Sequence, residues 1–446
     1  MKYNRSLAIS SKIQECMTGL TIGMLDSEFP KQIFEQKYSD KKLRDRVFSI
    51  NSTLLTMVLT ATQDDKTLHN SVTMYYAIHQ QKLILAKQEG EKEMELLRAA
   101  DLETGIVKAG RPKKYTVKLS KSLNKNISLN TAAYSKARDR VPMALIENLF
   151  KNSLVQDAKN AYTYWNGYKV LIGDGTYVQM QDSPSIRKEY EVKHNGEASG
   201  AYPQALIEVL IERGTGQISN YKVSDRHRSE LAVFYEMLDS VPQGSLLLLD
   251  DLYNCYEIIA KCIRLGIEIV IPAKRERNTV LLETWEDGDE IVKIMVPKKR
   301  SIWNESPEQA KELTVRMIKC RSIEGKEYEL LTTVLNKKIS KGDFQLLYLT
   351  RWDIEICIRE IKTIMDINIL RAQTPEMALK ELAVSLASYN LIRKMIYAST
   401  KDLLFSPKED FIYQLCTSNK RIFIDKKGRV YNKWSTGRRR TEGTHT

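Results

Sequence analysis

A run of four leucines at residues 246–249 limits what this chain can fold into. The run lies between Ser245 and Asp250, and a short apolar segment of this kind is typical of a β-strand buried on both faces. Helical patterns come before and after it, at residues 230–238 and 253–265. A strand that is buried on both faces needs cover on each side of its sheet. The chain is therefore predicted to have an α/β fold.

Three further strands are predicted before the leucine run. Residues 168–181 are rich in Val, Ile and Tyr, and residues 205–212 and 217–223 flank a Gly-Thr-Gly sequence that indicates a hairpin turn. The resulting order is strand, strand, strand, helix, strand, helix. This order is that of a ribonuclease-H-like mixed sheet, in which the leucine strand lies beside the first strand.

The charge of the chain favours a polyanionic partner. It carries 69 Lys and Arg against 56 Asp and Glu, a formal net charge of +13. Residues 108–125 contain no acidic residue, and residues 418–446 are also strongly basic. Arg111, Lys113 and Lys114 lie in a Gly-Arg-Pro segment that can follow the DNA minor groove. A solvated linker and a solubilising tail are the alternatives for these two segments.

Five regions are predicted along the chain. Residues 1–160 are helical with a basic linker and are expected to bind DNA. Residues 161–265 form the first part of a ribonuclease-H-like catalytic core, a β-rich insertion follows at 266–341, and residues 342–375 complete the core. Residues 376–446 hold a further helix and the basic tail, with DNA binding or dimerisation as their expected role.

Cysteine usage and hydropathy exclude other classes of protein. The six cysteines are scattered, so neither a zinc site nor a disulfide framework is indicated. Nowhere does an uncharged apolar run approach the roughly 20 residues that a membrane span needs. The chain is therefore expected in the bacterial cytoplasm, at the nucleoid.

The segment from residue 348 to residue 362 predicts a helix with one functional face. At about 100° per residue, four side chains project within an arc of roughly 60°: Tyr348, Arg351, Glu355 and Lys362. The carboxylate can hold a divalent metal, and the two cations can hold phosphate oxygens. Glu360 lies roughly 140° from Glu355 around the axis and does not share this face. The alternative for Glu355 is an ion pair with Arg351.

Two more carboxylates are expected at strand ends. Asp174 lies within or at the end of the first strand, between two glycines that would let a metal or a phosphate approach the backbone. Asp250 and Asp251 end the leucine strand, so they are expected near Asp174. The alternatives are an Asp-Gly turn at Asp174 and a helix N-cap at Asp250 or Asp251. The choice between Asp250 and Asp251 stays open at this point.

Three carboxylates that converge in such a core would hold two divalent metals about 3.5 to 4 Å apart. One metal would activate the attacking oxygen, and the other would stabilise the leaving oxygen. Oxygen-only ligation suits Mg²⁺, with Mn²⁺ as a substitute. Asp174, one of Asp250 and Asp251, and Glu355 are accordingly the candidate catalytic and metal-binding residues.

These residues resemble a known family. The spacing Y-x2-R-x3-E-x6-K is similar to the signature of DDE transposases of the insertion-sequence-4 type, and Trp352 follows the arginine as in several relatives. Asp174, followed by Gly-Thr, resembles the first aspartate of that family. Asp250 resembles the second because Tyr253 then keeps the family spacing, although relatives often have Arg-Gly where this chain has Asp251 and a leucine. The resemblance covers roughly residues 128–394.

The resemblance implies cut-and-paste transposition, with metal-dependent DNA cleavage and strand transfer at the terminal inverted repeats of an insertion sequence. It implies that Tyr348 and Arg351 hold the DNA backbone, that Trp352 stacks near a displaced base, and that Lys362 contacts a phosphate. The implied partners are double-stranded DNA, as terminal repeats and target, and a second copy of the chain in a synaptic homodimer. A transposase-derived DNA-binding protein without catalysis and a ribonuclease-H-like structure-selective nuclease are the alternative functions.

Overall fold

The structure of the protein is a computed structural model. It describes residues 47–103, 117, 119, 128–156, 163–194, 197–198, 200–273, 277–296, 312–321, 325–400, 423–424 and 430–431. Within these residues, helices and strands are built around one large, mostly antiparallel sheet, which confirms the predicted α/β class. No helix of the described part is both long enough and apolar enough to cross a membrane.

Ten strands of the described residues form the large sheet, in the order β6-β5-β2-β7-β8-β12-β11-β10-β9, with β1 paired to β2. These strands are β1 Tyr164–Trp165, β2 Tyr168–Gln179, β5 Gln204–Glu212, β6 Ile218–Asp225, β7 Ser245–Leu248, β8 Glu268–Pro272, β9 Thr279–Glu286, β10 Asp289–Met295, β11 Glu312–Arg321 and β12 Glu327–Thr332. Two short pairs lie outside it: β3 Lys193–His194 with β4 Glu197–Ala198, and β13 Phe423–Ile424 with β14 Val430–Tyr431.

In the half of the sheet from β6 to β8, the leucine strand β7 lies beside the first predicted strand, β2. β2 pairs antiparallel with β5, and β5 with β6, whereas β7 runs parallel to β2 and β8 parallel to β7. The leucine run forms β7 and continues one residue beyond it. Leu246 and Leu248 pack into one hydrophobic cluster, and Leu247 and Leu249 into another. The prediction of a strand buried on both faces, beside the first strand, is confirmed.

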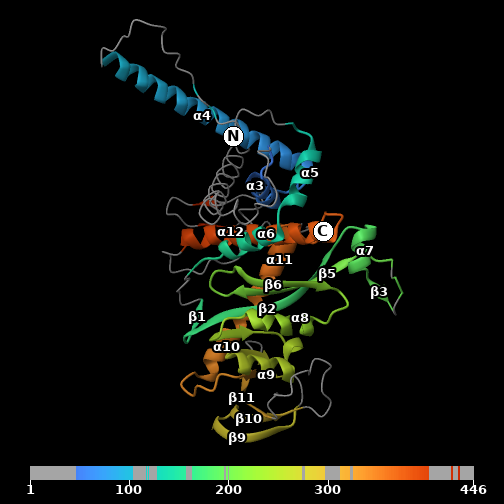
Figure 1. Cartoon of the computed structure of the whole chain (residues 1–446). Coiled ribbons are helices and arrows are strands. Elements are labelled where there is room, and N and C mark those ends of the chain that lie inside the picture. The colour runs from blue at the N-terminus through green and yellow to red at the C-terminus, as the bar shows by residue number, and fades with distance from the viewer. Residues whose placement is uncertain are drawn as a thin grey trace, which may run out of the picture.

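Helices cover both faces of this half of the sheet (Figure 1). On one face lie α8 (Glu230–Met237) and α9 (Tyr256–Leu265), whose apolar residues belong to a single cluster. On the other face lie α11 (Asp353–Arg359) and α12 (Pro375–Thr400). Much of α12 is buried and packs against α6 (Met143–Asn152), so this C-terminal helix is part of the scaffold.

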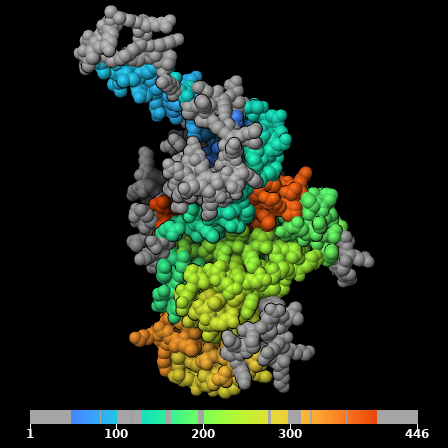
Figure 2. Space-filling view, in the orientation of Figure 1, coloured from blue at the N-terminus to red at the C-terminus, as the bar shows by residue number. Residues whose placement is uncertain are grey.

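The described N-terminal part is helical, as predicted. Its helices are α3 Ile50–Ala61, α4 Leu68–Glu103 and α5 Thr131–Arg140. The Ser49 side chain accepts the Ser52 N–H at 3.2 Å and so caps α3, which then packs against α12. α4 projects away from the body of the molecule (Figure 1). Figure 2 shows the described N-terminal helices at one end of the molecule and the strands β9 and β10 at the opposite end. Two further short helices are α7 Pro184–Tyr190 and the 3-10 turn η1 Leu238–Ser240.

The β-rich segment extends the same sheet. β12 pairs antiparallel with β8, and β11, β10 and β9 follow in antiparallel order. β8 was predicted within this segment, yet it pairs in parallel with β7 and so belongs to the run of strands around β2. At the far edge of the described sheet lies β9, whose Val280, Leu281 and Leu282 side chains are exposed.

A buried ion pair ties this extension to the helix that carries the predicted functional face. Arg316 of β11 donates to Asp289 at 2.7 Å, and both side chains are almost fully buried. The same guanidinium donates to the carbonyls of Asn336 at 3.1 Å and Ile339 at 2.9 Å. These carbonyls come directly before α10 (Lys341–Leu349), so the extension helps to fix where this helix begins.

Candidate active site

Asp174 lies near the middle of β2 and is half-buried. The alternation of the strand puts it on the face of Thr176, the face that α11 covers. Burial raises the pKa of Asp174 to about 6, against the effect of the Gly175 N–H, which donates to Oδ1 at 2.9 Å. The negative charge of Asp250 raises this pKa further, whereas Arg351 lowers it. The surroundings of Asp174 thus disfavour its charge, which a bound cation would favour.

The glycines on either side of this aspartate make room for side chains. A Cβ at Gly173 would lie 2.8 Å from Leu249, and a Cβ at Gly175 would lie 2.7 Å from Oε1 of Glu208. Both contacts are on the sheet face opposite to the aspartate. The predicted reason for these glycines, close approach of a metal or a phosphate, is therefore wrong for this face, because neighbouring side chains fill the space.

β7 ends at Leu248, and Asp250 follows after one further residue, Leu249. The parallel register pairs Ile172 with Leu248, and each candidate aspartate follows two residues later. The side chain of Asp250 accepts an N–H of the 3-10 turn Asp251–Tyr253 (η2) and caps it. The predicted alternative was an N-cap of the following helix, but the N-cap of α9 is Cys255. Of the two neighbouring aspartates, Asp250 is the one whose charge raises the pKa of Asp174. This geometry favours Asp250 over its neighbour as the second candidate ligand.

The predicted functional helix is irregular. It runs from α10 through a 3-10 turn at Thr350–Trp352 (η3) and through α11 into a π-helical turn at Glu360–Ile364 (η4). Such turns depart from 100° per residue, so the predicted arc is only approximate. Tyr348, the first of the four predicted residues, nevertheless reaches the strands, since its hydroxyl donates to the carbonyl of Leu249 at 3.2 Å. The phenol therefore lies beside the residue that precedes Asp250.

Arg351 and Glu355 are engaged with each other. The guanidinium donates to the carboxylate at 3.1 Å, with 15% of the arginine and 42% of the glutamate side chain exposed. The predicted alternative for Glu355, an ion pair, is therefore present. Glu360 faces α12 instead, where it accepts from Arg393 at 2.7 Å and from Tyr389 at 3.0 Å. The preference for Glu355 over Glu360 on this face thus agrees with the structure.

Two of the three predicted carboxylates are linked electrostatically, since the charge of Asp250 raises the pKa of Asp174. Arg351 lowers the pKa of Asp174 and is also paired with Glu355. Among the described residues, however, no group of three His, Cys, Asp or Glu side chains is arranged to hold a metal ion. Glu355 would have to leave Arg351 to join the aspartates.

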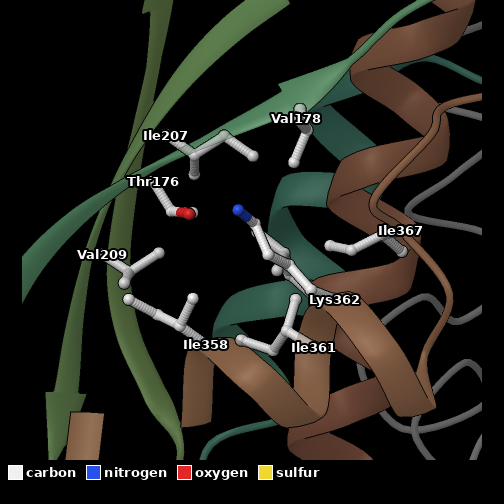
Figure 3. Close-up of a pocket in the computed structure, with 9 residues that line it drawn as sticks. Thr176, Val178, Ile207, Val209, Ile358, Ile361, Lys362 and Ile367 are labelled. Atoms are coloured by element: carbon white, nitrogen blue, oxygen red, sulfur yellow. The ribbon is translucent and has the colours of Figure 1, made fainter. Parts of the chain in front are cut away.

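Lys362 lies in an apolar pocket beside the site. Its ammonium group points toward Thr176 of β2 (Figure 3). The other residues that line the pocket are apolar: Val178, Ile207, Val209, Ile358, Ile361, Ile367 and Leu386. Burial in this pocket lowers the pKa of Lys362. Its predicted phosphate contact would require the side chain to turn outward.

The other predicted DNA contacts differ in where they lie. Trp352 is 59% exposed, and the Arg351 guanidinium lies 5.5 Å from its ring centroid. An exposed indole beside a cation can stack on a base. Arg111, Lys113 and Lys114 lie outside the described residues.

Two glutamates near the aspartates were missed. Glu208 of β5 is fully buried, and burial raises its pKa to about 8. Glu230 opens α8, and its pKa is raised by burial and by the charge of Asp250. A glutamate inside an otherwise apolar strand was the available signal for Glu208, while Glu230 resembles any acidic residue in a first helical turn.

The two aspartates fit a hard divalent cation. They offer only oxygen donors, and the raised pKa of Asp174 marks a carboxyl whose charged form lacks compensation. Mg²⁺ is usually held by one or two carboxylates, with water and phosphate completing its shell. The donor chemistry of Asp174 and Asp250 therefore suits Mg²⁺ or Mn²⁺.

A family model described as "Transposase DDE domain" matches residues 165–391, half of the 446-residue chain. Two curated proteins of Escherichia coli (strain K12) are similar. The chain is 24% identical over 269 residues to the transposase InsG for insertion sequence element IS4, covering 59% of this chain and 60% of that protein. It is 25% identical over 134 residues to the putative transposase InsZ, covering 29% and 45%. The chain thus matches less than two thirds of the length of either relative.

One solved structure is similar at a low level. It is a cryo-EM structure of the piggyBac transposase synaptic complex with hairpin DNA, with 10% sequence identity and a TM-score of 0.34. The likeness covers 66% of this chain and 59% of that one. At this score the likeness supports no argument about the site.

Proposed function

The chain belongs to the family of transposases with a DDE domain, of the insertion-sequence-4 type, and on this premise we propose that it carries out cut-and-paste transposition. It would cleave DNA at the terminal inverted repeats of an insertion sequence and join the released end to a target. The observation that carries the proposal is that Asp174 and Asp250 each follow, by two residues, the paired residues Ile172 and Leu248 of the parallel strands β2 and β7. Adjacent carboxylates of this kind suit metal-dependent phosphodiester chemistry.

The proposed core is ribonuclease-H-like. The order β6-β5-β2-β7-β8 supports this, with three antiparallel strands followed by two parallel ones. Helices on both faces of these strands add further support. The division of the chain at residues 160, 265, 341 and 375 is part of the same proposal, with β8 assigned to the core because it pairs with β7.

Asp174 and Asp250 are the proposed metal ligands, and Glu355 is the proposed third ligand once it has separated from Arg351. Bound Mg²⁺ or Mn²⁺ would supply a pair of cations that activate the attacking oxygen and stabilise the leaving oxygen. The chain itself orients the two aspartates through the register of β2 with β7 and through the cap on η2. Arg351, released by Glu355, would then be available to a DNA phosphate.

The proposed DNA contacts surround this pair. Tyr348 and Arg351 would hold the backbone, and the exposed ring of Trp352 would stack on a displaced base. Lys362 would contact a phosphate after leaving its pocket. Arg111, Lys113 and Lys114 would hold DNA farther from the cut, by charge.

The proposed partners are terminal-repeat DNA, target DNA and a second copy of the chain in a synaptic dimer. The net charge of +13 supports the nucleic-acid part of this proposal. Such a protein would act at the nucleoid in the bacterial cytoplasm, where insertion sequences lie.

The test is incubation of the purified full-length chain with a labelled inverted-repeat end and Mg²⁺, followed by gel analysis of the products. Cleavage followed by joining to target DNA is expected. Binding without cleavage would replace the proposal with a non-catalytic DNA-binding protein. Cleavage without joining, or cleavage that ignores the repeat sequence, would indicate a nuclease.

A further inference from the structure

Glu208 is a carboxyl group in a place where packing does not call for one. It lies in β5, where all residues from Ala205 to Glu212 are buried, and 0% of its surface is exposed. Its Oε1 has no hydrogen-bond partner among the described residues. An apolar side chain would fill such a position without the cost of desolvating a carboxyl group. The role of Glu208 therefore has to come from the contact that it does make.

That contact is with Tyr253, at the end of the turn that Asp250 caps. The Tyr253 hydroxyl donates to Oε2 of Glu208 at 3.0 Å, and both residues are fully buried. The Tyr253 ring also packs on Phe234, with ring centroids 4.5 Å apart. Because η2 spans only Asp251–Tyr253, fixing its last residue restricts where the capping aspartate can lie.

Glu208, the other partner in this hydrogen bond, lies on β5, which pairs with β2, the strand that holds Asp174. The antiparallel register pairs Glu208 directly with Gly175, the residue after Asp174. A Cβ at Gly175 would lie 2.7 Å from Oε1 of Glu208 and 3.1 Å from the carboxyl carbon of Glu230. The missing side chain of Gly175 thus leaves the space in which the Glu208 carboxyl group lies, on the sheet face opposite to Asp174.

We propose that Glu208 is a positioning residue, which acts through Tyr253 to set the distance between Asp250 and Asp174. The proposal rests on the proposed function, since it concerns the geometry of the same aspartate pair. The raised pKa of Glu208 supports it, because a carboxyl group that is neutral near pH 7 can stay buried here without a counter-ion. Without the hydrogen bond between Tyr253 and Glu208, the turn from β7 to η2 can move, and Asp250 and Asp174 no longer keep the distance at which both can bind one cation.

The test measures Mn²⁺ binding to the full-length chain by electron paramagnetic resonance, with thermal unfolding recorded for every variant. Glu208→Leu and Tyr253→Phe each remove the hydrogen bond and should weaken Mn²⁺ binding about tenfold, as lost support of metal ligands does. Glu208→Gln keeps an acceptor for the Tyr253 hydroxyl and should bind within about twofold of the wild type. The Glu208→Leu/Tyr253→Phe double variant should bind Mn²⁺ no more weakly than the single variant with the lower affinity, because both substitutions remove the same hydrogen bond.

Glu212→Gln is the matched control. Glu212 is a second buried glutamate of β5, but its partners are Lys169, at 2.6 Å, and the Thr215 hydroxyl, at 2.7 Å. This variant should lower thermal stability and leave Mn²⁺ affinity unchanged, which separates positioning from general destabilisation.

Each outcome bears on the proposal. Wild-type affinity in folded Glu208→Leu or in Tyr253→Phe would overturn the positioning role and leave the proposed function standing. Failure of the wild-type chain to bind Mn²⁺ would overturn both. If Glu208→Leu does not fold, the comparison of Tyr253→Phe with Glu208→Gln decides. Equal binding by that pair would also overturn the positioning role.

Discussion

The strand side and the helix side of the candidate site differ in what their functional side chains contact. On the strand side, Asp174 and Asp250 are aligned by the β2–β7 register, and η2 is capped and tethered. On the helix side, Arg351 is paired with Glu355, and Lys362 lies in an apolar pocket. The strand side is therefore held by the strand register and by the tether, whereas under the proposed function the helix side would exchange its internal contacts for contacts with metal and DNA.

The largest expected effect tests the strand side. Asp174→Asn and Asp250→Asn should each lower cleavage of a terminal-repeat end by more than about a thousandfold, because each removes a charged donor from the cation site. DNA binding, measured by gel shift, should remain. Asp251→Asn is the control and should cleave within about threefold of the wild type. Should Asp251→Asn be inactive and Asp250→Asn active, the second ligand has been misassigned.

The next effect tests whether the helix side exchanges partners. Glu355→Gln should lower cleavage by about a hundredfold or more and, by freeing Arg351, should tighten metal-free binding of end DNA a few-fold. Fluorescence anisotropy with EDTA present measures the second quantity. Asp353→Asn, in the same first turn of α11, is the control and should change neither. Unchanged cleavage by Glu355→Gln would leave this glutamate as a surface ion pair.

A smaller effect concerns the stability of the metal-free chain. The folded-state pKa of Asp174, about 6, lies above its ordinary value of 3.8. Ionisation of this group therefore costs no stability below about pH 4 and costs the most above about pH 6. Asp174→Asn should raise the free energy of unfolding in urea by about 1 to 2 kcal/mol at pH 7.5, and by much less at pH 4. A loss of stability at pH 7.5 would contradict this account.

The same pKa predicts a pH dependence of metal binding. Because Asp174 must be ionised to hold a cation, Mn²⁺ affinity should fall as the pH drops through about 6. Titration of the wild-type chain at several pH values measures this. Cation binding would lower the pKa of Asp174, so at high Mn²⁺ concentration the occupancy of the site should fall at a lower pH. An affinity that is flat between pH 7.5 and pH 5 would remove Asp174 from the site.

The smallest expected effect tests Lys362, whose side chain lies in the apolar pocket. Lys362→Met replaces an ammonium group in an apolar pocket and should stabilise the free chain by less than about 1 kcal/mol. If Lys362 turns outward to a phosphate, the same variant should weaken DNA binding and reduce its salt slope by about one. Arg359→Met, at an exposed position of α11, is the control. Unchanged binding would keep Lys362 in the pocket throughout.

The sequence predicts the strand side well because its signals are local. The leucine run requires two covered faces, and the order of elements then puts it beside the first strand. Asp174 and Asp250 stand out because each comes shortly after an apolar run, and their role as metal ligands stays a prediction. The ion pair of Glu355 with Arg351 was an open alternative for the same reason, since residues four apart on a helix are neighbours.

What the sequence could not predict depends on contacts between distant segments. The π-helical turn at Lys362 and its apolar pocket depend on β5 and α12, which periodicity within one helix does not include. Gly175 appeared to serve a ligand because Glu208, the residue that fills the space, is on another strand. β8 appeared to belong to the β-rich segment because its pairing with β7 leaves no mark on its own sequence.

The seam between β8 and β12 limits how such a gene could be shortened. Residues 270–272 pair with residues 330–332, and Leu331 is fully buried there. An in-frame deletion of residues 277–332 would leave an unpaired, apolar strand edge, which invites aggregation. It would also remove Arg316, which holds the carbonyls before α10. A compact descendant of this protein would therefore need a replacement strand along β8, and a shorter loop alone would not suffice.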